Sequence, residues 1–128
     1  MRTMLRMVLV LALATLPAGC LAAAAAAGAG GAIAYNERGA SSLVNRPAEN
    51  VAAAARAVLV DMGIAPDVDE VDGDDRVVSG SRGDLRVRVE IERESGNRSE
   101  VMVTAREGTL DYDREMARDI LSRIIARG

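Results

Sequence analysis

A strict alternation of apolar and charged side chains between Leu85 and Glu92 constrains the fold of this chain more than any other feature. Leu, Val and Ile occupy every second position, and Arg or Glu occupies the positions between them. Successive side chains of a strand point to opposite faces, so this segment predicts a strand with one buried and one solvated face. Sheets that face water on one side are commonly antiparallel, and we expect that arrangement here.

Three further segments have strand character. Residues 76–81 come just before the alternating segment, and the Gly83-Asp84 dipeptide between them suits a two-residue hairpin. After a turn at residues 95–97, residues 101–105 repeat the same alternation. Residues 39–44 predict a first, shorter strand.

Two segments have helical periodicity, and each places its apolar residues on one side. The first runs from Pro47 to Gly63, with Asn45 as a candidate cap and the glycine as the usual left-handed end. The second spans residues 112–126. Asp111 or Asp113 lies near its start, where a carboxylate interacts favourably with the positive end of the helix dipole. The apolar positions are Val51, Ala55, Val58, Leu59 and Met62 in the first helix, and Met116, Ala117, Ile120, Leu121 and Ile124 in the second.

The buried face of the sheet is the natural partner for both apolar helix faces. The sequence therefore predicts an α+β fold, namely a two-layer sandwich in which two helices cover one face of an antiparallel sheet, in the order β-α-β-β-β-α.

Residues 67–75 form the densest acidic run in the chain. Carboxylates clustered around Gly73 are what a calcium ion prefers, so a calcium loop is one interpretation. The spacing of an EF-hand is absent, however, and no Glu follows where it would close such a loop. We expect a solvated acidic turn that leads into a strand, and no metal.

The N-terminus has the pattern of a secretory signal, in which Arg2 and Arg6 precede an apolar run over residues 7–16. Ten residues rise only ~15 Å as a helix, about half of a ~30 Å hydrocarbon core. This segment alone is therefore too short to cross a bilayer.

Residues 16–20, Leu-Pro-Ala-Gly-Cys, resemble the lipobox of bacterial lipoproteins. The small residues before Cys20 match the pattern, whereas Pro17 stands where Leu is usual. The resemblance implies that Cys20 is acylated, becomes the first residue of the mature protein and anchors it to a membrane. Leu21 stands where an Asp would retain a lipoprotein in the inner membrane, which favours the periplasmic face of the outer membrane.

Two alternatives remain for this region. Residues 7–35 carry no charge and are long enough to span a bilayer if they stay uncleaved, although residues 22–34 are mostly Ala and Gly and contribute little transfer free energy. The second alternative is cleavage by an ordinary signal peptidase at a site within the alanine run. With lipobox cleavage, the chain divides into a signal (1–19), an Ala/Gly-rich tether (20–38) and one small domain (39–128).

The composition argues against several classes of function. The chain has no Phe, Trp, Lys or His, and its single cysteine excludes an internal disulfide. Two of the 16 arginines lie in the signal, so 14 remain against 19 acidic residues, a net charge of −5. An acidic chain with almost no aromatic residues is a poor nucleic-acid binder.

Catalytic groups are also scarce. Histidine and lysine are absent, the serines have no adjacent base to activate them, and Cys20 would be blocked by lipid. We therefore expect no enzyme activity, no catalytic residue and no cofactor.

The charged side of the alternating strand is the candidate interaction face. Arg86, Arg88, Glu90 and Glu92 share it, and interleaved Arg and Glu make a surface that a complementary partner protein can recognise. Met102 and Thr104 are expected alongside. The alternatives are ordinary solvation of that face, binding of a small ligand or lipid between sheet and helices, and an uncleaved membrane anchor that acts as an assembly subunit.

The order of these features resembles the domain-of-unknown-function 3568 family of short bacterial lipoproteins. The resemblance is carried by the lipobox cysteine, a small-residue tether that ends at Tyr35, a helix led by Pro47, alternating strands, and Gly108 before the last helix. It implies a lipid-anchored bacterial protein of uncharacterised function, and it carries over no catalytic or ligand-binding residues.

Overall fold

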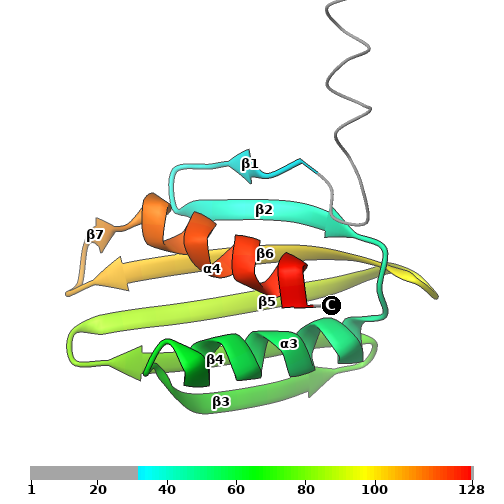
Figure 1. The fold of residues 1–128 in the computed structure, drawn as a ribbon, viewed down its shortest axis with the longest axis horizontal. Coiled ribbons are helices and arrows are strands. Elements are labelled where there is room, and N and C mark those ends of the chain that lie inside the picture. Colours follow the sequence, from blue (N-terminus) through cyan, green and yellow to red (C-terminus); the bar gives the residue numbers. More distant parts are fainter. Residues whose placement is uncertain (1–31, 128) are drawn as a thin grey trace, which may run out of the picture.

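The computed structural model describes residues 32–127, which form an antiparallel sheet with two helices on one face (Figure 1). This confirms the predicted α+β two-layer sandwich. The helices are α3 (Ala48–Asp61) and α4 (Arg114–Arg127). The strands are β1 (Ala34–Tyr35), β2 (Gly39–Val44), β3 (Ala65–Asp72), β4 (Asp75–Arg82), β5 (Leu85–Ser95), β6 (Arg98–Glu107) and β7 (Asp111–Tyr112).

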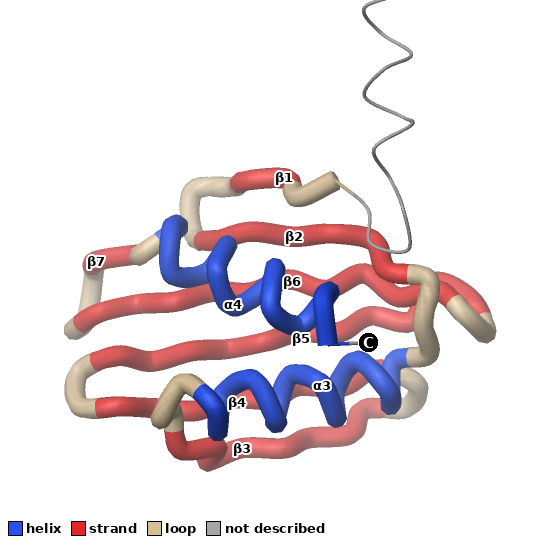
Figure 2. The backbone as a smooth tube through the Cα atoms, viewed as in Figure 1, coloured by secondary structure: helices blue, strands red, loops and turns tan. Residues whose placement is uncertain are grey.

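The strand order is β1-β2-β6-β5-β4-β3, and the short β7 pairs with β6 beyond the end of β2. Strands β3 to β6 follow one another through tight hairpins, whereas α3 carries the chain from β2 to the opposite edge of the sheet (Figure 2). The expected hairpin turn at Gly83 is confirmed, and its φ of 58° is one that glycine adopts without strain.

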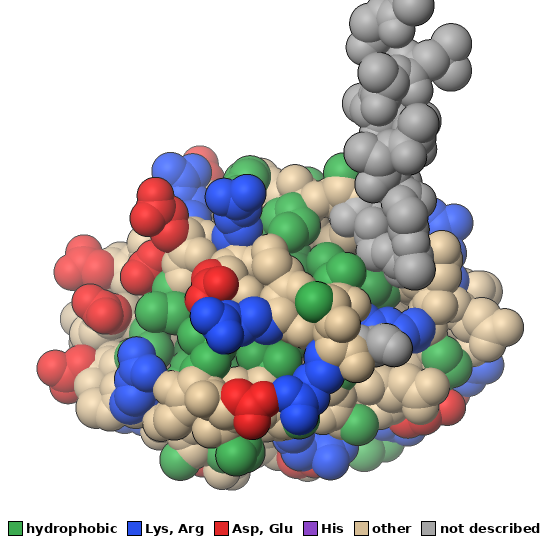
Figure 3. All heavy atoms as spheres, viewed as in Figure 1, with side chains coloured by type: hydrophobic (Ala, Val, Ile, Leu, Met, Phe, Trp, Pro, Cys, Tyr) green, Lys and Arg blue, Asp and Glu red, His purple; other side chains and the backbone are tan. Residues whose placement is uncertain are grey.

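An aliphatic core fills the space between the two layers. The predicted apolar faces of both helices are buried, apart from Met62 and Met116, which are only partly buried. They pack on the alternating apolar residues of the sheet, among them Val78, Val89 and Val103, all 0% exposed. The solvent side of the helices carries Arg, Asp and Glu around smaller apolar areas (Figure 3).

Both helix ends follow from local chemistry, with two corrections to the sequence predictions. Asp113 caps α4, because its Oδ1 accepts a hydrogen bond from the backbone N–H of Met116 at 2.9 Å. The helix therefore begins after Tyr112, which belongs to β7. The prediction of Asn45 as a cap for α3 is wrong, because Pro47 occupies the N-cap and no side chain caps the helix. Gly63, with φ of 71°, ends α3 as predicted.

The acidic run is not a turn, as the sequence suggested, but mostly strand β3 at the edge of the sheet. Only Gly73 and Asp74 form the turn, and Asp72 pairs with Asp75 across it. Arg56 of α3 forms an ion pair with Asp69 at 2.7 Å and ties the strand to the helix layer. Acidic side chains and a bulge protect an exposed edge against pairing with other chains.

The expected tether, residues 20–38, reaches into the described sheet, because Ala34 and Tyr35 form β1 and pair with β2. The signal, residues 1–19, and Cys20 lie outside the described residues. No helix within residues 32–127 has the length and apolar character needed to cross a membrane.

Arg46 joins three parts of the domain. Its guanidinium donates to the carbonyl oxygens of Ile124 at 2.9 Å and Ile125 at 3.3 Å, near the end of α4. Its own carbonyl accepts a hydrogen bond from the buried hydroxyl of Ser99 on β6 at 2.8 Å. Burial lowers the pKa of the Arg46 guanidinium. The positive charge lies at the negative end of the helix dipole, where it is favourable.

Replacing Arg46 with Ala is expected to lower the free energy of unfolding by about 2 kcal/mol, because hydrogen bonds to a charged group contribute ~1.5–3 kcal/mol. Urea denaturation of the variant and the parent measures the difference. Arg118→Ala, an exposed position of α4, is the matched control and should change stability by less than about 0.5 kcal/mol. Equal losses in both variants would contradict this role of Arg46.

Candidate functional site

The side of the sheet opposite the helices carries the candidate site, and we call it the open face. Both helices contact the other side. The central residues of the open face are Arg86, Arg88, Glu90 and Glu92 on β5, and Glu100, Met102, Thr104 and Arg106 on β6. The intervening residues of both strands point into the core, so alternation alone fixes which side chains are solvated.

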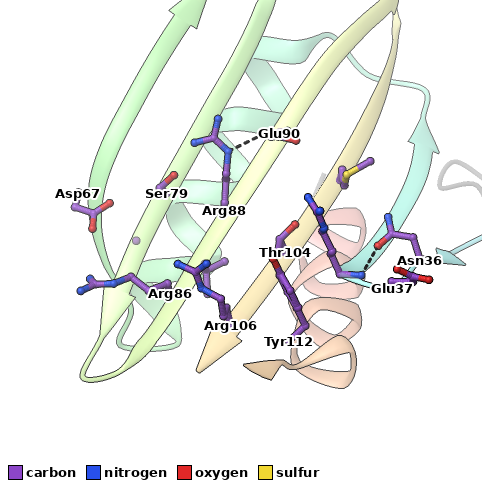
Figure 4. Close-up of a pocket in the computed structure, with 14 residues that line it drawn as sticks. Asn36, Glu37, Asp67, Ser79, Arg86, Arg88, Glu90, Thr104, Arg106 and Tyr112 are labelled. Carbon is purple, nitrogen blue, oxygen red and sulfur yellow. Dashed lines mark hydrogen bonds and ion pairs between the residues drawn. The ribbon is translucent and has the colours of Figure 1, made fainter. Parts of the chain in front are cut away.

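Two arginines stand directly opposite each other at one end of the open face. Arg86 on β5 pairs in register with Arg106 on β6, and Arg106 pairs in turn with Tyr112 on β7. Figure 4 shows these three residues at the same end of the strands (Figure 4). Among residues 32–127, neither arginine side chain has an acidic partner within ion-pair distance. Like charges in opposed positions of a sheet are destabilising, so this end favours an added negative charge.

Arg106 has a further unsatisfied group. Its Nε is buried without a hydrogen-bond acceptor in the part of the chain that the structure describes. A buried donor without a partner costs roughly 1–3 kcal/mol. The unpartnered Nε of Arg106 therefore lowers the stability of the free domain.

Two glutamates stand directly opposite each other at the other end of the open face. Glu92 on β5 pairs in register with Glu100 on β6, and neither carboxylate has a basic partner within the described residues. Between the two ends, the neighbouring side chains Arg88 and Glu90 form an ion pair at 2.7 Å. The open face thus has a positive end, a neutralised centre and a negative end.

A hollow of about 720 Å³ lies over the positive end and the centre of the open face. The β1–β2 turn borders it on one side and Asp67 of β3 on the other (Figure 4). Asn36 shapes the turn, because its Oδ1 accepts the backbone N–H groups of Arg38 and Gly39 at 2.9 and 2.7 Å. The lining includes charged residues of both signs: Glu37, Arg38, Asp67, Arg86, Arg88, Glu90 and Arg106.

Three of the four residues predicted for the interaction face line this hollow, together with Met102 and Thr104. Glu92, the fourth, is on the same side of the sheet but beyond the hollow. Sequence reasoning missed Arg106, although it continues the alternation of Met102 and Thr104. It also missed Arg38 and Tyr112, whose positions depend on how β1, β2 and β7 pair.

The chemical groups of the hollow include charged side chains and one phenol. Within residues 32–127, no three His, Cys, Asp or Glu side chains are grouped so that they could hold a metal ion. The titratable groups of the hollow are arginines, carboxylates and Tyr112. Charged side chains of both signs enable this surface to bind charged groups.

The family model described as "Protein of unknown function (DUF3568)" matches residues 3–127. The chain belongs to this family. The match includes every strand and helix of the described domain, so the open face is part of the DUF3568 region. The comparison with curated proteins gives no match. The description of DUF3568 assigns no activity.

Proposed function

We propose that this DUF3568 protein is a non-catalytic, lipid-anchored module of the bacterial cell envelope that binds another protein through its open face. The proposal rests on an uncovered sheet face that has a hollow. At each end of this face, two side chains of like charge stand opposite each other without an oppositely charged partner. Such an arrangement costs stability in the free domain and gains favourable contacts when a complementary surface covers it.

Lipid anchoring is the second part of the proposal, and it rests on the lipobox resemblance that ends at Cys20. Two or more acyl chains hold a protein stably at a membrane, because burial contributes ~0.8 kcal/mol per CH₂. Residues 21–31 reach at most roughly 40 Å even if fully extended, so the domain stays close to its membrane. We propose the periplasmic face of the outer membrane as the location.

Binding of a small ligand is the alternative function, and the volume of the hollow favours it. A volume of about 720 Å³ lies within the ~300–1,000 Å³ typical of small-molecule sites. Those sites are mostly apolar and bury most of the ligand, whereas this hollow is open and lined by charged side chains. A protein surface is the partner that such a lining fits better.

Site-specific crosslinking in cells tests the proposal. Because the chain has no lysine, amine-reactive reagents find no side chain to attack, so a photoreactive residue is placed at Met102, at the centre of the open face. We expect illumination to link the anchored full-length protein to a protein partner. Adding Arg86→Glu and Arg88→Glu should lower the yield of that product at least tenfold.

The matched control reverses two charges on the opposite side of the domain. Arg114→Glu with Arg118→Glu changes the net charge by the same amount, but both residues are exposed on α4. This control should leave the crosslinked product unchanged. If the product persists with Arg86 and Arg88 reversed, the open face is not the binding surface.

A further inference from the structure

We propose that the protein partner of the open face is a second copy of this chain, packed face to face in a symmetric dimer. This inference rests on the proposed function and identifies the partner. It comes from the charges of β5 and β6, because their arginine end is complementary to the glutamate end of an inverted second copy.

The centre of this symmetry is the paired residues Val89 of β5 and Val103 of β6. Arg86 and Glu92 lie three residues to either side of Val89 on β5. Arg106 and Glu100 lie three residues to either side of Val103 on β6. Because β5 and β6 are antiparallel, both arginines fall at one end of the face and both glutamates at the other.

A two-fold axis that lies between two facing sheets, perpendicular to their strands, reverses the direction of the strands. It therefore places the Arg86 and Arg106 end of one copy over the Glu92 and Glu100 end of the other. Both unpaired ends are neutralised at once, and the same patch is used on both copies, as an isologous interface requires. Long Arg and Glu side chains tolerate the ~30° angle between packed sheets.

The shape of the open face and the residues near the two-fold axis are consistent with this dimer. The hollow lies over the arginine end, and neither Glu92 nor Glu100 lines it, so it is free to receive the glutamate end of the partner. Near the axis, the internally paired Arg88 and Glu90 need no partner, and Met102 supplies partly exposed apolar surface.

The size of the face predicts a weak dimer. The five longer strands, β2-β6-β5-β4-β3 in sheet order, lie ~4.8 Å apart, and seven residues of a strand span ~23 Å. Each copy therefore contributes roughly 550 Å² of surface to the interface. The total of about 1,100 Å² falls just below the ~1,200–2,000 Å² of stable interfaces. Anchoring of both copies on one membrane raises their effective concentration and compensates for a weak contact.

Charge exchange between the two ends tests the inference. We compare four full-length chains in detergent by native mass spectrometry: the parent, Arg86→Glu/Arg106→Glu, Glu92→Arg/Glu100→Arg, and a chain with all four substitutions. The parent should be dimeric, and each double variant should dissociate at least tenfold more readily. A mixture of the two double variants should recover the dimer.

The chain with all four substitutions is the decisive control, because its net charge equals that of the parent. It should form a dimer like the parent, since its two ends have only exchanged signs. A parent that stays monomeric at its highest soluble concentration would overturn the inference. Failure of the four-substitution chain to dimerise while its thermal unfolding remains cooperative would do so as well.

The photoreactive residue at Met102 separates this inference from the proposed function. Crosslinks between two copies of the chain support both. Crosslinks only to a different protein leave the proposed function standing and show that the second-copy inference is wrong. The absence of any crosslinked protein contradicts both.

Discussion

Replacing Cys20 with Ser should remove all fatty acid from the protein. The sulfur of Cys20 is the atom that the lipobox pattern offers for acylation. A serine hydroxyl at this position is not acylated in its place. Mass spectrometry of the N-terminal peptide measures the effect. In the parent, that peptide should begin at Cys20 and carry acyl chains.

Leu21→Ala is the matched control, because it leaves Cys20 and the small residues before it in place, and it should remain acylated. A parent chain with Met1 intact, or with an unmodified Cys20, would contradict the prediction. An intact Met1 would instead favour the uncleaved membrane segment over residues 7–35.

Replacing Gly39 with Ala should lower the free energy of unfolding by about 3 kcal/mol or more. A Cβ at this position would lie 1.9 Å from the backbone carbonyl oxygen of Val103, far inside contact distance. A backbone atom cannot rotate away as a side chain can, so β2 and β6 must separate locally. Overpacking in well-packed regions costs ~1–3 kcal/mol, and this contact is closer than most.

Such a loss is a large part of the ~5–15 kcal/mol that stabilises a typical domain. Chemical denaturation of both chains measures it. Gly96→Ala is the matched control, because a Cβ there meets nothing within 4 Å, and stability should change by less than about 0.5 kcal/mol. Equal stability of the Gly39 variant and the parent would show that β2 does not pack against β6 as described.

The fold class could be predicted from the sequence because two kinds of periodicity pointed to one core. Alternation from Leu85 to Glu92 determined which strand face is buried, and the apolar stripes of both helices matched it. Strand β3 escaped prediction because Asp has low strand propensity and valines occur on both faces of the strand. Its pairing with β4 is a tertiary effect that local propensity does not contain.

The candidate site could be predicted only in part. The alternation placed Arg86, Arg88, Glu90 and Glu92 together on the solvated side of β5. The opposed pairs depend on the register between β5 and β6, which shifts at the irregularity between Arg93 and Ser95. No turn motif in the sequence specifies that shift, so the charge symmetry became visible only in the structure.

Photo-crosslinking from the two sides of the anchored domain shows directly whether the open face is the binding surface. One full-length chain carries the photoreactive residue at Met102 on the open face, and another carries it at Val60, a 61% exposed position of α3. We expect the yield of a specific protein product from position 102 to be at least tenfold above that from position 60. Equal yields from both positions, or a higher yield from position 60, would contradict it.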